Sequence, residues 1–201
     1  MRKVLVFLCA VSLLISSCAS TEVKRVDPQR QIDLSGYWND TDVRIVCESL
    51  INDCLSSARV DQEISARGGR IPTVIVGRFR NETDEQINTA IVSSIMESVI
   101  FNSGKLNFVA NPNTRDDLRA EKQDQNQGNA SEATAAGIGK EIGADFMLTG
   151  SVMTIVDRAG NQTVRTYFVT AELTNIETNS RIWMAQNNEI KKVITRPRNR
   201  F

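Results

Sequence analysis

Residues 71–79 read Ile-Pro-Thr-Val-Ile-Val-Gly-Arg-Phe, a short run rich in β-branched residues. A strand tolerates proline near its beginning, so this stretch predicts a buried strand. From Asp84 to Asn102 the apolar residues recur at helical spacing, and Ser103-Gly104 ends the pattern. Lys105 to Val109 predicts a second strand. Because a strand, a helix and a strand with short joints form a right-handed crossover, we expect the two strands to be parallel.

A helix is expected before this unit, from about Asp40 to Ala58, where apolar residues follow a spacing of three and four. It contains Cys47 and Cys54, which are seven residues apart. On a helix this spacing is about 10.5 Å along the axis, beyond the roughly 7 Å that a disulfide allows between Cα atoms. We interpret both cysteines as core positions. A broken helix or pairing between molecules are the alternatives.

The apolar period falls to two near the end of the chain, where turn-forming residues separate three predicted strands: Phe146 to Val156, Thr163 to Ile176 and Arg181 to Val193. These strands predict an antiparallel C-terminal meander. The fold class is therefore expected to be α+β, with a mixed sheet of about five strands and helices packed on it.

Two further helices are predicted between the crossover and the meander. Residues 111–127 are polar and rich in charge, so we expect a solvated or partly docked helix there. A second helix should run from Ala133 to Ile142, after Ser131 as its cap and before Gly143.

The composition excludes several classes of function. The chain has 201 residues, 41% of them hydrophobic, with 24 basic and 24 acidic residues and no histidine. A balanced charge lacks the basic footprint of nucleic-acid binding, so no nucleic-acid partner is expected. The absence of histidine removes the commonest general base and the commonest zinc ligand. We expect no catalytic residue, no cofactor and no metal.

Two residue clusters could suggest a calcium site and a phosphate loop, but simple structural roles explain both better. Four carboxylates lack the spacing of a calcium loop and fit a solvated helix face better: Asp116, Asp117, Glu121 and Asp124. The glycines around Gly137-Ile138-Gly139 follow no strand and precede no Lys-Ser/Thr pair, so they favour close helix packing over a phosphate loop.

The N-terminus has the pattern of a secretory signal. Arg2 and Lys3 precede an apolar run from Val4 to Ile15, which is too short to span a bilayer. Ile15-Ser16-Ser17-Cys18 follows and resembles the bacterial lipobox, which implies acylation of Cys18 after removal of residues 1–17 as a lipoprotein signal peptide. A plain secretory signal with a chance cysteine is the alternative. Since no aspartate follows Cys18, the outer membrane is the expected location.

The rest of the chain divides into a lipidated N-terminus and flexible tether over 18–35, a single domain over 36–194 and a basic tail over 195–201. Two basic groups stand out. Arg115, Arg119 and Lys122 should share one helix face and could guide docking of a partner. The terminal run is expected to be a solvated, frayed tail, with contact to anionic lipid as the alternative: Lys191, Lys192, Arg196, Arg198 and Arg200.

Several motifs together resemble the LpoB family of penicillin-binding protein activators, from about Leu34 to Lys192. They include Pro72 to Gly77 followed by Arg80-Asn81, Asn102 to Lys105, Gly143 to Gly150, and Ile182-Trp183-Met184. The resemblance implies a CsgG-like domain and an outer-membrane lipoprotein that faces the periplasm. The best-known members carry a long proline-rich linker, whereas the tether predicted here is short.

The resemblance also implies a function. The chain is expected to be a non-catalytic regulator, attached to the membrane by its lipid anchor, whose partner is a bifunctional penicillin-binding protein, that is, a peptidoglycan synthase. An accessory subunit of an outer-membrane secretion or assembly complex is the alternative. An enzyme acting on cell-wall polymer is disfavoured because no catalytic constellation stands out.

Overall fold

The computed structural model describes residues 22–197 apart from 69, 111, 130, 132, 134, 135 and 137–141. The predicted signal peptide, Cys18 and most of the helix predicted over 133–142 lie outside the described residues. The chain divides into two compact units, Met1–Gln31 and Ile32–Phe201. In the first, Arg30 N donates to Asp27 O at 3.0 Å to close a turn. Among the described residues, no helix combines the length and the apolar character needed to cross a membrane.

The second unit begins with helix α2, Asp40–Ser56, which starts at a capping box. Asn39 Oδ1 accepts from Asp42 N at 3.1 Å, and Asp42 Oδ2 accepts from Asn39 N at 2.9 Å. Cys47 and Cys54 are buried free thiols, and burial raises the pKa of each to about 12. The prediction that they are core positions is confirmed.

The predicted end of this helix at Ala58 is wrong. The backbone of Ser57 is extended, with φ −70° and ψ 126°, so α2 stops before it and a separate helix, α3, runs over Ala58–Ala66. Val60 of α3 is buried, and the helix packs against α2 and against strand β5, Arg181–Asn187. The apolar spacing alone did not reveal this break.

The predicted strand–helix–strand unit with two parallel strands is confirmed. Strand β1, Thr73–Glu82, leads through helix α4, Thr89–Ser103, to strand β2, Asn107–Phe108, and the two strands pair in parallel. The helix starts later than predicted because a hydrogen-bonded loop precedes it, in which Asn81 Nδ2 donates to Glu85 O at 2.6 Å. Gly104 ends α4 with φ +66°, a conformation that favours glycine.

The rest of the sheet comes from four strands: β3 Phe146–Ala159, β4 Gln162–Asn175, β5 Arg181–Asn187 and β6 Lys191–Thr195. The order is β2-β1-β3-β4-β5, with β6 paired to β4. Strand β3 runs parallel to β1, whereas β4 is antiparallel to β3, β5 and β6. The predicted α+β class with a mixed sheet and an antiparallel C-terminal part is confirmed.

The strand predicted over 181–193 is in fact two strands, which gives the sheet a sixth strand. Strand β5 pairs with the second half of β4 and β6 pairs with its first half. Between them the chain turns at Asn187, whose buried side chain accepts from Glu189 N at 3.1 Å. Both strands therefore share one edge of β4.

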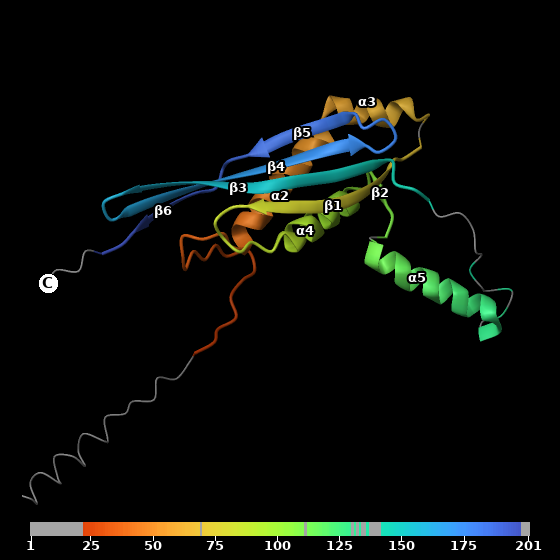
Figure 1. Ribbon diagram of the computed structural model, residues 1–201, viewed down its shortest axis with the longest axis horizontal. Helices are drawn as coiled ribbons and strands as arrows, with labels where there is room; N and C mark the ends of the chain where they lie inside the picture. The colour runs from red at the N-terminus through yellow and green to blue at the C-terminus, as the bar shows by residue number, and fades with distance from the viewer. Residues whose placement is uncertain are drawn as a thin grey trace, which may run out of the picture. The chain divides into compact units, whose positions relative to one another are not determined.

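The core lies between the sheet and helices α2 and α4, which pack side by side against it (Figure 1). Alternate residues of β4 are buried, among them Tyr167, Val169 and Leu173. Trp183 is also buried, and its Nε1 donates to Asp53 Oδ2 at 2.8 Å. Gly150 faces the ring of Phe79 so closely that no Cβ would fit between them.

Helix α5, Pro112–Asp124, confirms the helix predicted over 111–127. Its side chains over 114–124 are exposed or half-buried, as expected of a solvated helix. The four carboxylates of the predicted solvated face are all exposed: Asp116, Asp117, Glu121 and Asp124. No cluster of three or more potential metal-binding side chains occurs within the described part of the chain.

Candidate functional site

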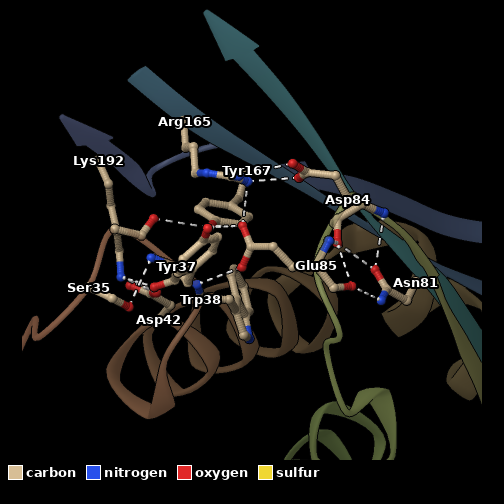
Figure 2. Close-up of polar contacts among 12 residues, drawn as sticks. Ser35, Tyr37, Trp38, Asp42, Asn81, Asp84, Glu85, Arg165, Tyr167 and Lys192 are labelled. Carbon is tan, nitrogen blue, oxygen red and sulfur yellow. Dashed lines mark hydrogen bonds and ion pairs between the residues drawn. The ribbon is translucent and has the colours of Figure 1, made fainter. Parts of the chain in front are cut away.

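The segment that enters the domain, residues 33–38, is held against it by polar contacts, and we call it the strap (Figure 2). Trp38 N donates to Glu85 Oε2 at 3.0 Å, and the Tyr167 hydroxyl lies 3.4 Å from Gly36 O. Asp33, which lies in the predicted tether, accepts from Asn39 Nδ2 at 2.6 Å. The domain therefore begins to hold the chain before the predicted boundary at residue 36.

An ion cluster centred on the buried guanidinium of Arg165 lies next to the strap (Figure 2). Arg165 Nη1 contacts Asp84 Oδ1 at 2.7 Å and Glu85 Oε1 at 2.6 Å, and its Nη2 contacts Asp84 Oδ2 at 2.9 Å. The side chains of Arg165 and Glu85 are only 6% and 7% exposed. The hydrogen bond between Asp84 and Arg165 lowers the pKa of Asp84 and raises that of Arg165, so both stay charged.

Tyr167 connects this cluster to the strap. Its hydroxyl lies 2.6 Å from Glu85 Oε1, and burial, together with this carboxylate, raises the pKa of Tyr167 well above its usual value. The phenol therefore stays neutral and donates. The rings of Trp38 and Tyr167 lie 5.1 Å apart, and the guanidinium of Arg165 lies 4.8 Å from the ring centre of Tyr37.

A second ion cluster joins the strap to β6. Lys192 Nζ contacts Asp42 Oδ2 at 2.6 Å and Asp33 Oδ1 at 3.0 Å, and it donates to Tyr37 O at 2.9 Å. The Lys192 side chain is 12% exposed. Burial raises the pKa of Asp42, although the hydrogen bond to Lys192 opposes this effect.

The prediction of a frayed, solvated tail is wrong for its first residues. Lys191 and Lys192 belong to β6 and pair with β4. The backbone of Arg196 continues this pairing, because its N–H donates to Asn161 O at 2.9 Å and its carbonyl accepts from Asn161 Nδ2 at 3.0 Å. The pairing of β6 with β4, in which alternate residues are half-buried, orders this segment, and a count of basic residues did not reveal it.

A cavity of about 460 Å³ lies beside the strap. Tyr37 and Trp38 form one wall, the loop that carries Asp84 and Glu85 forms another, and Ile91 of α4 stands in it half exposed. The remaining lining residues are Asn39, Asp40, Val43, Gln86, Ile87 and Asn88. Most of the surface is apolar, so the cavity can receive an apolar side chain.

Asp145 forms a separate clamp where β1 and β3 begin. Its Oδ1 accepts from Arg67 Nη1 at 2.7 Å and from Arg70 Nη2 at 2.6 Å, and its Oδ2 accepts from Thr73 N at 2.8 Å. Burial acts to raise the pKa of Asp145, but the bonds from Arg70, Thr73 and Arg67 outweigh it and the pKa is lowered. Arg67 also lies 4.7 Å from the ring centre of Phe146.

Asp145→Asn should lower the free energy of unfolding by about 2 kcal/mol at neutral pH, because two guanidinium groups lose a charged acceptor. A lowered pKa in the folded state means that this stability is present above pH 3.8, the ordinary value, and is lost as the pH falls further. The free energies of unfolding of the parent and the variant, measured with urea, should therefore converge in acid. Asp61→Asn, which changes an exposed carboxylate in the first turn of α3, is the control. A difference that persists unchanged in acid would contradict this interpretation.

The predicted docking residues lie on α5, away from the strap in sequence. Arg115 Nε donates to Ala110 O at 2.8 Å, and Arg119 Nη1 contacts Asp116 Oδ1 at 3.0 Å. Lys122 follows one turn later on the same helix and is half-buried. Their spacing on one helix face is as predicted, and their role stays a prediction.

Sequence reasoning missed the strap and its two ion clusters. One signal was present: Arg165 stands in phase with Tyr167 and Val169 on an alternating strand, so a charge falls on the buried face. A buried arginine needs carboxylate partners, which could have directed attention to Asp84 and Glu85.

The fold and the site together define a small α+β domain whose N-terminal strap is locked onto a six-stranded mixed sheet. A family model described as peptidoglycan-synthase activator LpoB matches residues 42–189. The chain belongs to this family, whose function is the activation of peptidoglycan synthases. The resemblance noted from the sequence motifs is thereby confirmed.

Several solved structures resemble the chain at low sequence identity. The LpoB C-terminal domain from Salmonella enterica is 15% identical, with 77% of this chain and 99% of that chain covered and a TM-score of 0.42. The corresponding domain from Escherichia coli is 16% identical, with 72% and 96% covered and a TM-score of 0.43. Lipoprotein GNA1162 from Neisseria meningitidis is 13% identical, with 64% and 88% covered and a TM-score of 0.38. No curated protein matches the chain at a significant level.

Proposed function

We propose that this chain is a non-catalytic lipoprotein of the outer membrane that binds a bifunctional penicillin-binding protein in the periplasm and activates it. The observation that carries the proposal is the family match over residues 42–189. The lipobox-like sequence that ends in Cys18 supports the anchor. The absence of histidine supports a role without catalysis.

Activation requires that the domain bind the active conformation of the synthase more tightly than the resting one. A tenfold preference corresponds to about 1.4 kcal/mol. The preference itself must come from contacts that only the active conformation completes. A rigid surface strengthens this binding because little of the binding energy is lost in ordering itself. The strap contributes rigidity, since the domain fixes the entering chain from Asp33 onward.

The strap also limits the reach of the domain. Residues 18–33 span at most about 50 Å when fully extended. The domain therefore works close to the membrane that holds the lipid, and the synthase extends toward it. The basic face of α5, formed by Arg115, Arg119 and Lys122, would guide this encounter by long-range attraction.

Cys18→Ser should remove the anchor. The variant should lose incorporation of labelled palmitate and should move from the membrane fraction to the soluble periplasmic fraction, because several acyl chains are needed for stable attachment. Growth with the labelled fatty acid, followed by fractionation, measures both effects. Cys47→Ser is a matched control, because a buried cysteine is no acylation site. Palmitate that persists in the Cys18 variant would contradict the lipobox interpretation.

Affinity capture tests the proposed partner. The full chain, purified in detergent, is used as bait in detergent-solubilised envelope from its own cell, and retained proteins are identified by mass spectrometry. A bifunctional synthase should be enriched. Enrichment of a secretion channel in its place would favour an accessory role in an outer-membrane secretion complex and would count against the proposal.

A further inference from the structure

We infer that the cavity beside the strap is a docking pocket for a basic, aliphatic segment of the synthase. This inference rests on the proposed function and names the chemistry of the partner at one site. The occupant would place the head of a lysine or arginine near Asp40 and Asp84, with an apolar side chain against Trp38 and Ile91.

The apolar part of the argument concerns the walls. Trp38, Val43, Ile87 and Ile91 line the cavity, and Ile91 is 50% exposed although it stands on a helix whose other face is buried in the core. Completing the burial of such a side chain contributes about 1 kcal/mol. The ring of Trp38 packs on Tyr167, which fixes this apolar wall in place.

The charges of the lining select a basic occupant. Asp40, Asp84 and Glu85 line the cavity, and no lysine or arginine of the described chain does. Arg165 lies behind the wall and neutralises part of this charge through Asp84 and Glu85. Asp40 is exposed, and its carboxylate forms no hydrogen bond or ion pair with the residues that the structure describes. An excess of negative charge is left at the rim.

The strap forms one wall of the pocket. Tyr37 and Trp38 form a wall only while the strap is held by Glu85, Tyr167 and Lys192. A partner that fills the pocket would therefore contact the segment leading to the membrane anchor as well as the domain. Docking and the position of the tether would then be linked.

The test compares two pocket variants with matched controls in binding to the purified full-length synthase. Asp40→Asn removes the unpaired charge, and Asp61→Asn removes an acidic residue from the first turn of α3. Ile91→Ser removes the half-exposed apolar group, and Ile155→Ser changes an isoleucine that is 62% exposed on β3. The full chain is used in detergent, and unchanged thermal unfolding shows that each variant is folded.

Asp40→Asn should weaken binding about threefold at low salt, mainly through slower association, and less at high salt. Ile91→Ser should weaken binding about fivefold, mainly through faster dissociation. Both controls should bind like the parent chain. Binding by the two pocket variants that equals the parent would overturn the pocket and leave the proposed function intact. Loss in Ile91→Ser without loss in Asp40→Asn would overturn the basic occupant. If the parent itself binds no synthase, the proposed function fails and the pocket fails with it.

Discussion

Arg165→Met should lower the free energy of unfolding by about 3 kcal/mol or more, the largest stability effect that we expect of any single substitution in the strap site. The guanidinium is 6% exposed and binds two carboxylates, and Glu85 is almost as buried. Removing one member of a buried ion pair leaves the other charged and without its partner, which typically costs about 3–5 kcal/mol. Tyr167 would remain as a donor to Glu85, but it carries no positive charge.

A double substitution separates this cause from simple loss of packing. Arg165→Met with Glu85→Gln should be more stable than Arg165→Met alone, because the buried unpaired carboxylate is gone. The amide oxygen that Glu85→Gln introduces can still accept from Trp38 N and keep the strap attached. Urea unfolding at neutral pH measures all the variants. A double variant that is as unstable as the sum of both single variants would contradict the ion-pair explanation.

The single substitution Arg165→Met should also loosen the strap. Trp38 packs on Tyr167 and lines the cavity, so its indole fluorescence reports whether the strap is in place. In Arg165→Met the indole of Trp38 should become more accessible to a soluble fluorescence quencher while the domain is still folded. The other tryptophan, Trp183, is held by Asp53 and gives a background that should not change.

The second large effect concerns function. The full chain should raise the rate of its cognate synthase severalfold and in a saturable manner, because an activator that prefers the active state tenfold shifts the equilibrium by about 1.4 kcal/mol. The chain alone should not turn over peptidoglycan or its lipid-linked precursor.

Charge reversal on α5 should alter the concentration dependence of this activation. Arg115→Glu with Arg119→Glu should slow association most at low salt, since exposed charges act over about 10 Å at 0.1 M ionic strength. The maximal stimulation should stay the same. Normal activation by this variant at every salt concentration would remove α5 from the interface and leave the activator function intact.

Local patterns in the sequence were sufficient for most of the fold. The alternation in β3 and β4 and the helical spacing in α2 and α4 reflect faces that are buried in the core, which is why these elements were predictable. The break at Ser57 was not, since the apolar period continues through it. The division between β5 and β6 depends on which half of β4 each strand pairs with, a long-range choice.

The candidate site was less predictable because it depends on contacts between distant segments. Glu85 is joined to Tyr167 and Trp38, and Lys192 is joined to Asp33. In the sequence each of these residues resembles an ordinary surface charge or a core aromatic. Their roles arise because β4 and β6 lie next to the point where the strap enters the domain. These segments are far apart in the sequence, so no short window of sequence contains the contacts.

The central claim is activation of a peptidoglycan synthase, and the most direct measurement is the rate of glycan-strand polymerisation by the purified cognate synthase as the full chain is titrated in detergent. The rate should rise with concentration and reach a plateau. The same titration with heat-unfolded chain should leave the rate unchanged. A flat rate across the titration with the folded chain, for every bifunctional synthase of its own cell, would contradict the account.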